Sequence, residues 1–147
     1  MKSLYQIIVI SLFLITSISC FPPMQEGPDP HTIEFQREDF NEIRQYFQEN
    51  RTITNFYVDT SPDEVSKEIL KKMKEIGFLH YKDWGNYQTF TCGYGVLGLS
   101  WGFIHGKFTD KEIEDPKFNI EGELKEFTIT YLKNLEGDWY RFGAGER

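Results

Sequence analysis

Cys92 is the residue in this sequence best suited to covalent chemistry, because a thiol activated by a neighbouring base can act as a nucleophile. Reactive cysteines need an accessible, electropositive setting. Cys92 instead follows Phe90 on the same face of a strand expected over residues 87–92. A cysteine in that position behaves as a small buried hydrophobic side chain. We therefore predict no catalytic role for it.

The histidines that could activate Cys92 are not expected to reach it. With a four-residue turn at residues 83–86, His80 and Cys92 fall on opposite faces of the hairpin, although a one-residue slip of register would reverse this. A turn at residues 93–95 would leave His105 about 30 Å from Cys92. The sequence thus predicts no nucleophile–base pair and no catalytic residues.

Metal-ligand patterns are also missing from the sequence. His31, His80 and His105 share no spacing typical of zinc sites. The acidic residues within 112–115 lack the alternating oxygen ligands and central glycine of a calcium-binding loop. We expect no metal and no cofactor.

Aromatic side chains offer another kind of recognition, because their rings can stack on a sugar or a peptide. Most are expected to be half-buried in a sheet. Trp84 and Tyr94 both fall at predicted turns, where binding residues concentrate. They are the residues we predict for ligand binding.

The N-terminal segment has the pattern of an export signal. Lys2 precedes a mainly apolar run over residues 7–15, which is too short to span a bilayer. Ser17 and Ser19 are small, which suits cleavage before Cys20. Residues 1–19 are therefore expected to be a signal peptide.

Residues 17–20 resemble the lipobox of bacterial lipoprotein precursors, usually Leu-(Ala/Ser)-(Gly/Ala/Ser)-Cys. Ser19 and Cys20 match it, whereas Ser17 and Ile18 replace the usual leucine and small residue. The resemblance implies that Cys20 becomes the first mature residue and carries acyl chains. Residues 20–33 would then be an anchor and a semi-rigid proline-rich spacer. Without lipid, Cys20 would be the first residue of a secreted protein.

The charge of the chain limits its partners. Of its 16 basic residues only Lys2 lies within residues 1–19, which leaves 15 against 23 acidic residues and a net charge of −8. This balance argues against binding nucleic acid, or anionic lipid through a basic face.

Two helices are predicted after the spacer. Residues 34–50 place Phe40, Ile43 and Phe47 on one stripe. Residues 61–76 begin with the capping-box sequence Ser-Pro-Asp-Glu and end before Gly77, which suits a left-handed cap.

The rest of the chain has the pattern of strands, apart from a charged loop over residues 109–123. Gly98 and Gly102 lie on one face of a long strand, where we expect a helix to cover them. Residues 34–147 are thus predicted to form one α+β domain, with two N-terminal helices packed on an antiparallel sheet of about four to five strands. The segments with strand pattern are residues 51–59, 78–82, 87–92, 96–108, 125–133 and 139–142.

The closing segment EFTITYLKNLEGDWYRF, residues 126–142, resembles the last hairpin of many cystatin-like and nuclear-transport-factor-like domains. In those domains an acidic-glycine turn also precedes a tryptophan. The resemblance implies a fold of that general type and carries no functional residue over to this chain.

These features favour a lipid-anchored cell-envelope protein whose small acidic domain binds a protein, peptide or glycan and has no chemistry of its own. A secreted hydrolase using Cys92 or a carboxylate is one alternative. A soluble secreted inhibitor or immunity-type protein is the other.

Overall fold

The computed structural model describes residues 32–60, 63–95, 99–116, 118–119 and 128–145. The predicted signal peptide, Cys20, most of the spacer and Gly98 lie outside the described residues.

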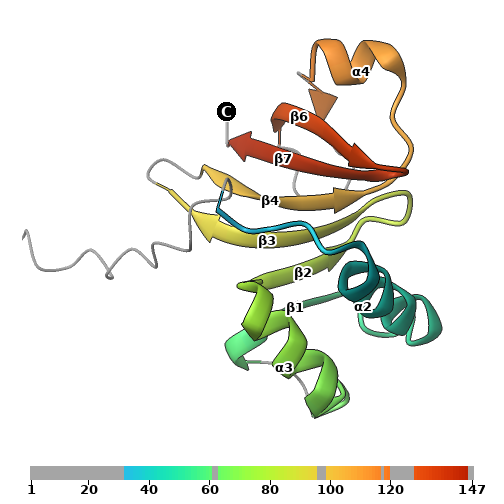
Figure 1. Ribbon diagram of the computed structural model, residues 1–147, viewed down its shortest axis with the longest axis vertical. Helices are drawn as coiled ribbons and strands as arrows, with labels where there is room; N and C mark the ends of the chain where they lie inside the picture. The colour runs from blue at the N-terminus through green and yellow to red at the C-terminus, as the bar shows by residue number, and fades with distance from the viewer. Residues whose placement is uncertain (1–31, 61–62, 96–98, 117, 120–127, 146–147) are drawn as a thin grey trace, which may run out of the picture.

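The described strands form one antiparallel sheet with the order β1-β2-β3-β4-β7-β6-β5 (Figure 1). The predicted α+β class and antiparallel sheet are confirmed. Five longer strands make the body of the sheet, and a short strand, β1 or β5, extends it at each edge. The strands are β1 (Asn55–Tyr57), β2 (His80–Asp83), β3 (Gln88–Tyr94), β4 (Ser100–His105), β5 (Phe118–Asn119), β6 (Thr128–Glu136) and β7 (Trp139–Gly145).

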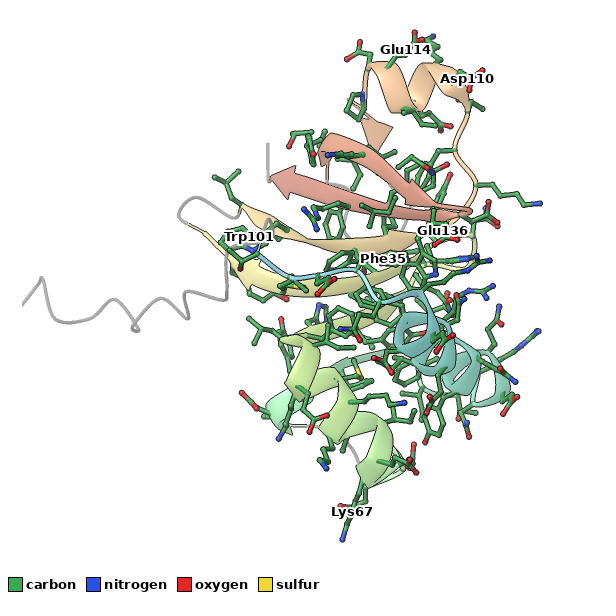
Figure 2. All side chains as sticks on the ribbon, viewed as in Figure 1. Phe35, Lys67, Trp101, Asp110, Glu114 and Glu136 are labelled. Atoms are coloured by element: carbon green, nitrogen blue, oxygen red, sulfur yellow. The ribbon has the colours of Figure 1, made fainter. Side chains whose placement is uncertain are left out.

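Helices α2 (Arg37–Glu49) and α3 (Lys67–Ile76) build the main core with one face of the sheet. The stripe predicted for α2 is buried, and the ring of Phe40 meets that of Phe103 edge-to-face at 4.7 Å. Phe35, just before α2, packs against the same core (Figure 2). Aromatic contacts of this kind fix the helix on the sheet.

A second hydrophobic cluster lies on the other face of the sheet. Ile104 belongs to it, whereas the adjacent Phe103 belongs to the main core, because side chains alternate along a strand. Partly buried aromatic side chains pack against this second cluster, together with Ile113 of the short helix α4 (Asp110–Glu114). Figure 1 places α4 at the end of the molecule opposite α2 and α3.

The start predicted for the second helix is wrong. Helix α3 begins at Lys67 rather than at residue 61. The hydroxyl of Tyr46 accepts a hydrogen bond from the Ser66 N–H at 2.8 Å and donates to the Glu64 carbonyl at 3.1 Å. These contacts hold the preceding chain in a turn. The helix does end as predicted, with Gly77 at φ +94°.

The predicted loop over residues 109–123 is wrong in its first part, because α4 lies there. Thr109 caps this helix, since its hydroxyl accepts from the Glu112 N–H and the Glu112 carboxylate accepts from the Thr109 N–H. This is the capping-box arrangement that the sequence predicts at residues 61–64 instead.

The prediction that a helix covers Gly102 is also wrong. A Cβ at this residue would lie 2.2 Å from the carbonyl oxygen of Phe90 and 2.9 Å from the Cα of Thr91. Both atoms belong to β3, next to an irregularity in the β3–β4 pairing. The close approach is therefore between two strands of the sheet.

Candidate functional site

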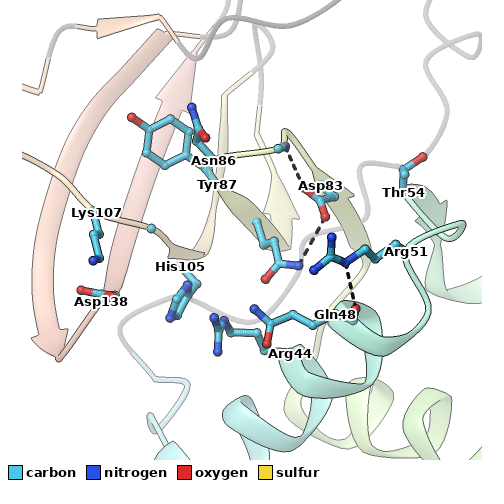
Figure 3. A pocket seen from close by; sticks show the side chains of 13 residues that line it. Arg44, Gln48, Arg51, Thr54, Asp83, Asn86, Tyr87, His105, Lys107 and Asp138 are labelled. Atoms are coloured by element: carbon cyan, nitrogen blue, oxygen red, sulfur yellow. Dashed lines mark hydrogen bonds between the residues drawn. The ribbon is translucent and has the colours of Figure 1, made fainter.

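A polar cavity of about 810 Å³ lies between α2 and one end of the sheet (Figure 3). The turns β2–β3 and β6–β7 and the end of β4 meet there because antiparallel pairing brings them to the same end of the sheet. The cavity is lined by Arg44, Gln48, Arg51, Thr54, Asp83, Gly85, Asn86, Tyr87, Gln88, His105, Gly106, Lys107 and Asp138.

Helix α2 supplies Arg44 and Gln48, one turn apart and therefore on the same face. Arg44 is half-buried beside the buried stripe of α2. Within the described residues its guanidinium forms no hydrogen bond or ion pair, and its Nε is buried without a partner. Burial lowers the pKa of Arg44, and the charge of Asp138 only partly opposes this. The fold thus places the positive charge of Arg44 in a partly buried position with too little negative charge nearby to offset the loss of water.

His105, the last residue of β4, has its ring edge-on to Trp139 at 5.0 Å. Its pKa is lowered to about 4, first by burial and then by the charge of Arg44, while Asp138 acts in the other direction. The imidazole is therefore neutral near pH 7. In that state it can donate one hydrogen bond and accept another.

The two carboxylates that line the cavity, Asp83 and Asp138, differ in their hydrogen bonding within the described residues. Asp83 accepts from the Gly85 N–H at 2.7 Å and from the Gln88 amide at 3.4 Å, so both of its oxygens have partners. Asp138 acts on its neighbours through its charge. Arg51 binds the Gln48 carbonyl through Nε at 3.3 Å. With Arg44, Arg51 and Lys107 present, cations outnumber carboxylates here, although the whole chain has a net charge of −7.

Cys92 is not among the residues that line this cavity. It is fully buried in the main core, with its Sγ 3.8 Å from the Phe90 carbonyl oxygen. Burial raises the pKa of the thiol, which disfavours the reactive thiolate. The structure thus agrees with the predicted small hydrophobic role.

Neither histidine pairs with Cys92. His80 pairs with Thr91, one residue before Cys92, so the two side chains lie on opposite faces as predicted. The predicted turn is displaced, because Asp83 pairs with Gln88. This displacement shifts the register by two residues and preserves the faces.

The predicted distance of about 30 Å from Cys92 to His105 is wrong. The β3–β4 connection falls later than expected, since Tyr94 pairs with Ser100. His105 consequently pairs with Gln88, about 13 Å along β3 from Cys92. That separation is still too long for proton transfer between the two side chains.

The two aromatic residues predicted for ligand binding lie outside the cavity. Trp84 is half-buried on the other face of the sheet, where its Nε1–H donates to the Thr89 hydroxyl at 3.1 Å and the Lys82 ammonium lies 4.0 Å from its ring. Trp84 thus serves mainly to cover that face.

Tyr94 is the last residue of β3 rather than part of a turn. It borders a smaller hollow of about 440 Å³, together with Tyr57 and Leu79. The structure does not bring Tyr94 and Trp84 into one site.

The cavity residues were not predicted from the sequence. The sequence does not single out Arg44, and it suggests His105 only as a possible base for Cys92 or a possible zinc ligand. The available signal was the i, i+4 spacing of Arg44 and Gln48 at the margin of the buried stripe.

Among the described residues, no group of three or more histidine, cysteine or acidic side chains could hold a metal ion. Within the same part of the chain, no helix has the length and apolar character needed to cross a membrane. Comparisons with family models, characterised proteins and solved structures found no match.

Proposed function

We propose that this chain is a lipid-anchored cell-envelope protein whose folded domain binds a ligand in the cavity beside α2. The observation that carries the binding role is a group of polar side chains that line the cavity and form no hydrogen bond or ion pair within the described residues. These are Arg44, Gln48, His105 and Lys107. Unpartnered polar groups that converge on a concave site are typical of ligand pockets, and a volume of about 810 Å³ is in their usual range.

Binding without catalysis fits the chemistry of the lining. No cysteine or serine is among the described lining residues. A histidine with a pKa of about 4 is a weak base near neutral pH. The anchor is supported by the partial lipobox and the proline-rich segment, both of which are sequence features.

Ligand binding in the cavity is tested by a substitution that narrows the cavity. Gln48→Trp adds an indole at an exposed lining residue of α2, and Gln45→Trp adds the same group to an exposed residue of the same helix outside the lining. The full-length chain in a mild non-ionic detergent is melted with and without the low-molecular-weight fraction of an extract of its own cells. We expect this fraction to raise the Tm of wild type and Gln45→Trp, but not of Gln48→Trp.

An equal rise in Gln48→Trp would show that the ligand binds elsewhere. No rise in wild type would contradict small-molecule binding altogether. Conversion of a compound in the fraction by wild type would favour the hydrolase alternative.

A further inference from the structure

We infer that the group held in the cavity is an oxyanion, a carboxylate or phosphate carried by a small molecule. This inference rests on the proposed binding role and specifies its ligand. The first observation is that the cavity contains cations that are unpaired among the described residues. Arg44 of α2 and Lys107, two residues after β4, both line the cavity, and neither forms an ion pair within the described residues (Figure 3).

The nearby acids do not neutralise these cations. Asp83 is engaged by the Gly85 N–H and the Gln88 amide. Asp138 is then the single lining carboxylate without a hydrogen bond in the described part of the chain, and it faces two unpaired cations. One negative group is therefore missing from the site. An anionic ligand supplies it, whereas a cationic ligand would add to the imbalance.

The types of donor favour an oxyanion. A guanidinium presents a planar fork of N–H groups that matches the two oxygens of a carboxylate or phosphate, and an ammonium adds a point charge. The Gln48 amide and the neutral His105 ring lie in the same lining and can donate further hydrogen bonds. Burial of Arg44 strengthens its attraction for an anion, because water screens it less.

The cavity also indicates more than a bare ion. Its volume of about 810 Å³ matches sites for small organic molecules, and Thr54 and Asn86 provide neutral polar groups in the lining. The oxyanion is thus expected to be one end of a larger polar molecule.

The test uses sodium phosphate and sodium citrate as probes, with sodium chloride at matched ionic strength as the control. The full-length chain in a mild non-ionic detergent is titrated with each salt, and both its Tm and the imidazole NMR signal of His105 are followed. We expect phosphate or citrate, but not chloride, to raise the Tm. Bound anion should also raise the pKa of His105, because a negative charge favours the imidazolium.

Two charge variants test whether the anion binds in the cavity. Lys107→Gln removes an exposed cation of the lining that has no partner among the described residues, so folding should be preserved. Lys67→Gln removes the same charge at the start of α3, outside the cavity (Figure 2). We expect Lys107→Gln to weaken anion binding about tenfold or more and Lys67→Gln to leave it unchanged.

The outcomes separate this inference from the proposed function. Stronger binding of phosphate identifies a phosphate group, and stronger binding of citrate identifies a carboxylate. Failure of both salts, or equal weakening by Lys107→Gln and Lys67→Gln, would overturn the oxyanion. If the cell extract still raises the Tm of wild type but not of Gln48→Trp, the cavity binds a ligand of another class. If the extract fails as well, the binding role itself is wrong.

Discussion

At the scale of single residues, Arg44 occupies a position where the folded chain holds a positive charge at a cost. Its guanidinium loses water on folding and gains no hydrogen bond or ion pair from the described residues. A ligand site commonly contains such groups, because the partner that would satisfy them is the ligand.

Arg44→Gln should therefore keep the Tm of the unliganded chain or raise it by about 2 °C. It should also raise the pKa of His105 from about 4 towards its ordinary value, because the charge of Arg44 is one of the causes that lower it. Thermal melting and NMR titration measure the two effects, with Lys67→Gln as the control. A fall of several degrees would assign Arg44 a structural role.

Cys92 should be dispensable for binding. Cys92→Ser places a hydroxyl where a fully buried thiol now lies, and we expect a loss of about 1–2 kcal/mol in the free energy of unfolding. Urea unfolding measures the loss, and titration with phosphate and citrate measures binding. Lost binding with stability intact would restore the cysteine as a functional residue.

Two histidines should make the fold sensitive to acid. The pKa values of His80 and His105 are both lowered to about 4, mainly by burial, so the unfolded chain binds more protons than the folded chain between pH 6.5 and 4. Stability is fully present above about pH 6.5 and is lost as the pH falls towards 4. Thermal melts across this range should show a falling Tm, and the fall should be smaller in His80→Gln. An unchanged pH profile in this variant would contradict its part in the effect.

At the scale of elements, the close approach of β3 and β4 depends on a residue without a side chain. Gly102→Ala would drive its Cβ into the Phe90 carbonyl oxygen, so the backbone must shift. We expect a loss of about 1–3 kcal/mol in urea unfolding. Gly143→Ala is the matched control on β7, because its nearest contact would be an ordinary 3.4 Å from the Tyr131 side chain. Equal free energies of unfolding for the two variants would show that the backbone of β3 can shift at little energetic cost.

Local sequence patterns predicted which helices and strands form better than they predicted the residues at which these elements begin and end. The buried stripe of α2 and the cap at Gly77 depend on neighbouring residues and were predicted correctly. The start of α3 depends on Tyr46, 20 residues before Ser66, and therefore could not be read from the capping motif. The missed α4 had a readable signal in Thr109 and Glu112.

The candidate site was harder to predict than the elements. Arg44, His105 and Asp138 are far apart in sequence and meet only through the pairing of β4 with β7 and the packing of α2. None of them has a local pattern that distinguishes it from a surface charge or a core histidine. The burial that lowers the pKa of His105 is likewise a property of the assembled fold.

At the scale of the whole molecule, negative charge and a positive cavity have separate effects. A net charge of −7 disfavours association with nucleic acid and with anionic lipid. Fields from exposed charges are screened within about 8–10 Å at physiological salt, so the cations of the cavity still dominate at short range. An acidic protein can thus bind a small anion at one site.

The proposed lipid anchor at Cys20 would place this domain at a membrane. We expect Cys20 to become the first mature residue, with acyl chains on its sulfur and amino group. Each buried methylene contributes about 0.8 kcal/mol, and one chain alone binds only marginally, so two or more are needed for a durable anchor. The proline-rich residues after it would hold the acidic domain clear of the headgroups. Metabolic labelling with a tagged fatty acid should mark wild type but not Cys20→Ser, and the variant should enter the soluble fraction. If wild type takes up no label and is itself soluble, the chain is a secreted protein, while the cavity beside α2 keeps its proposed role.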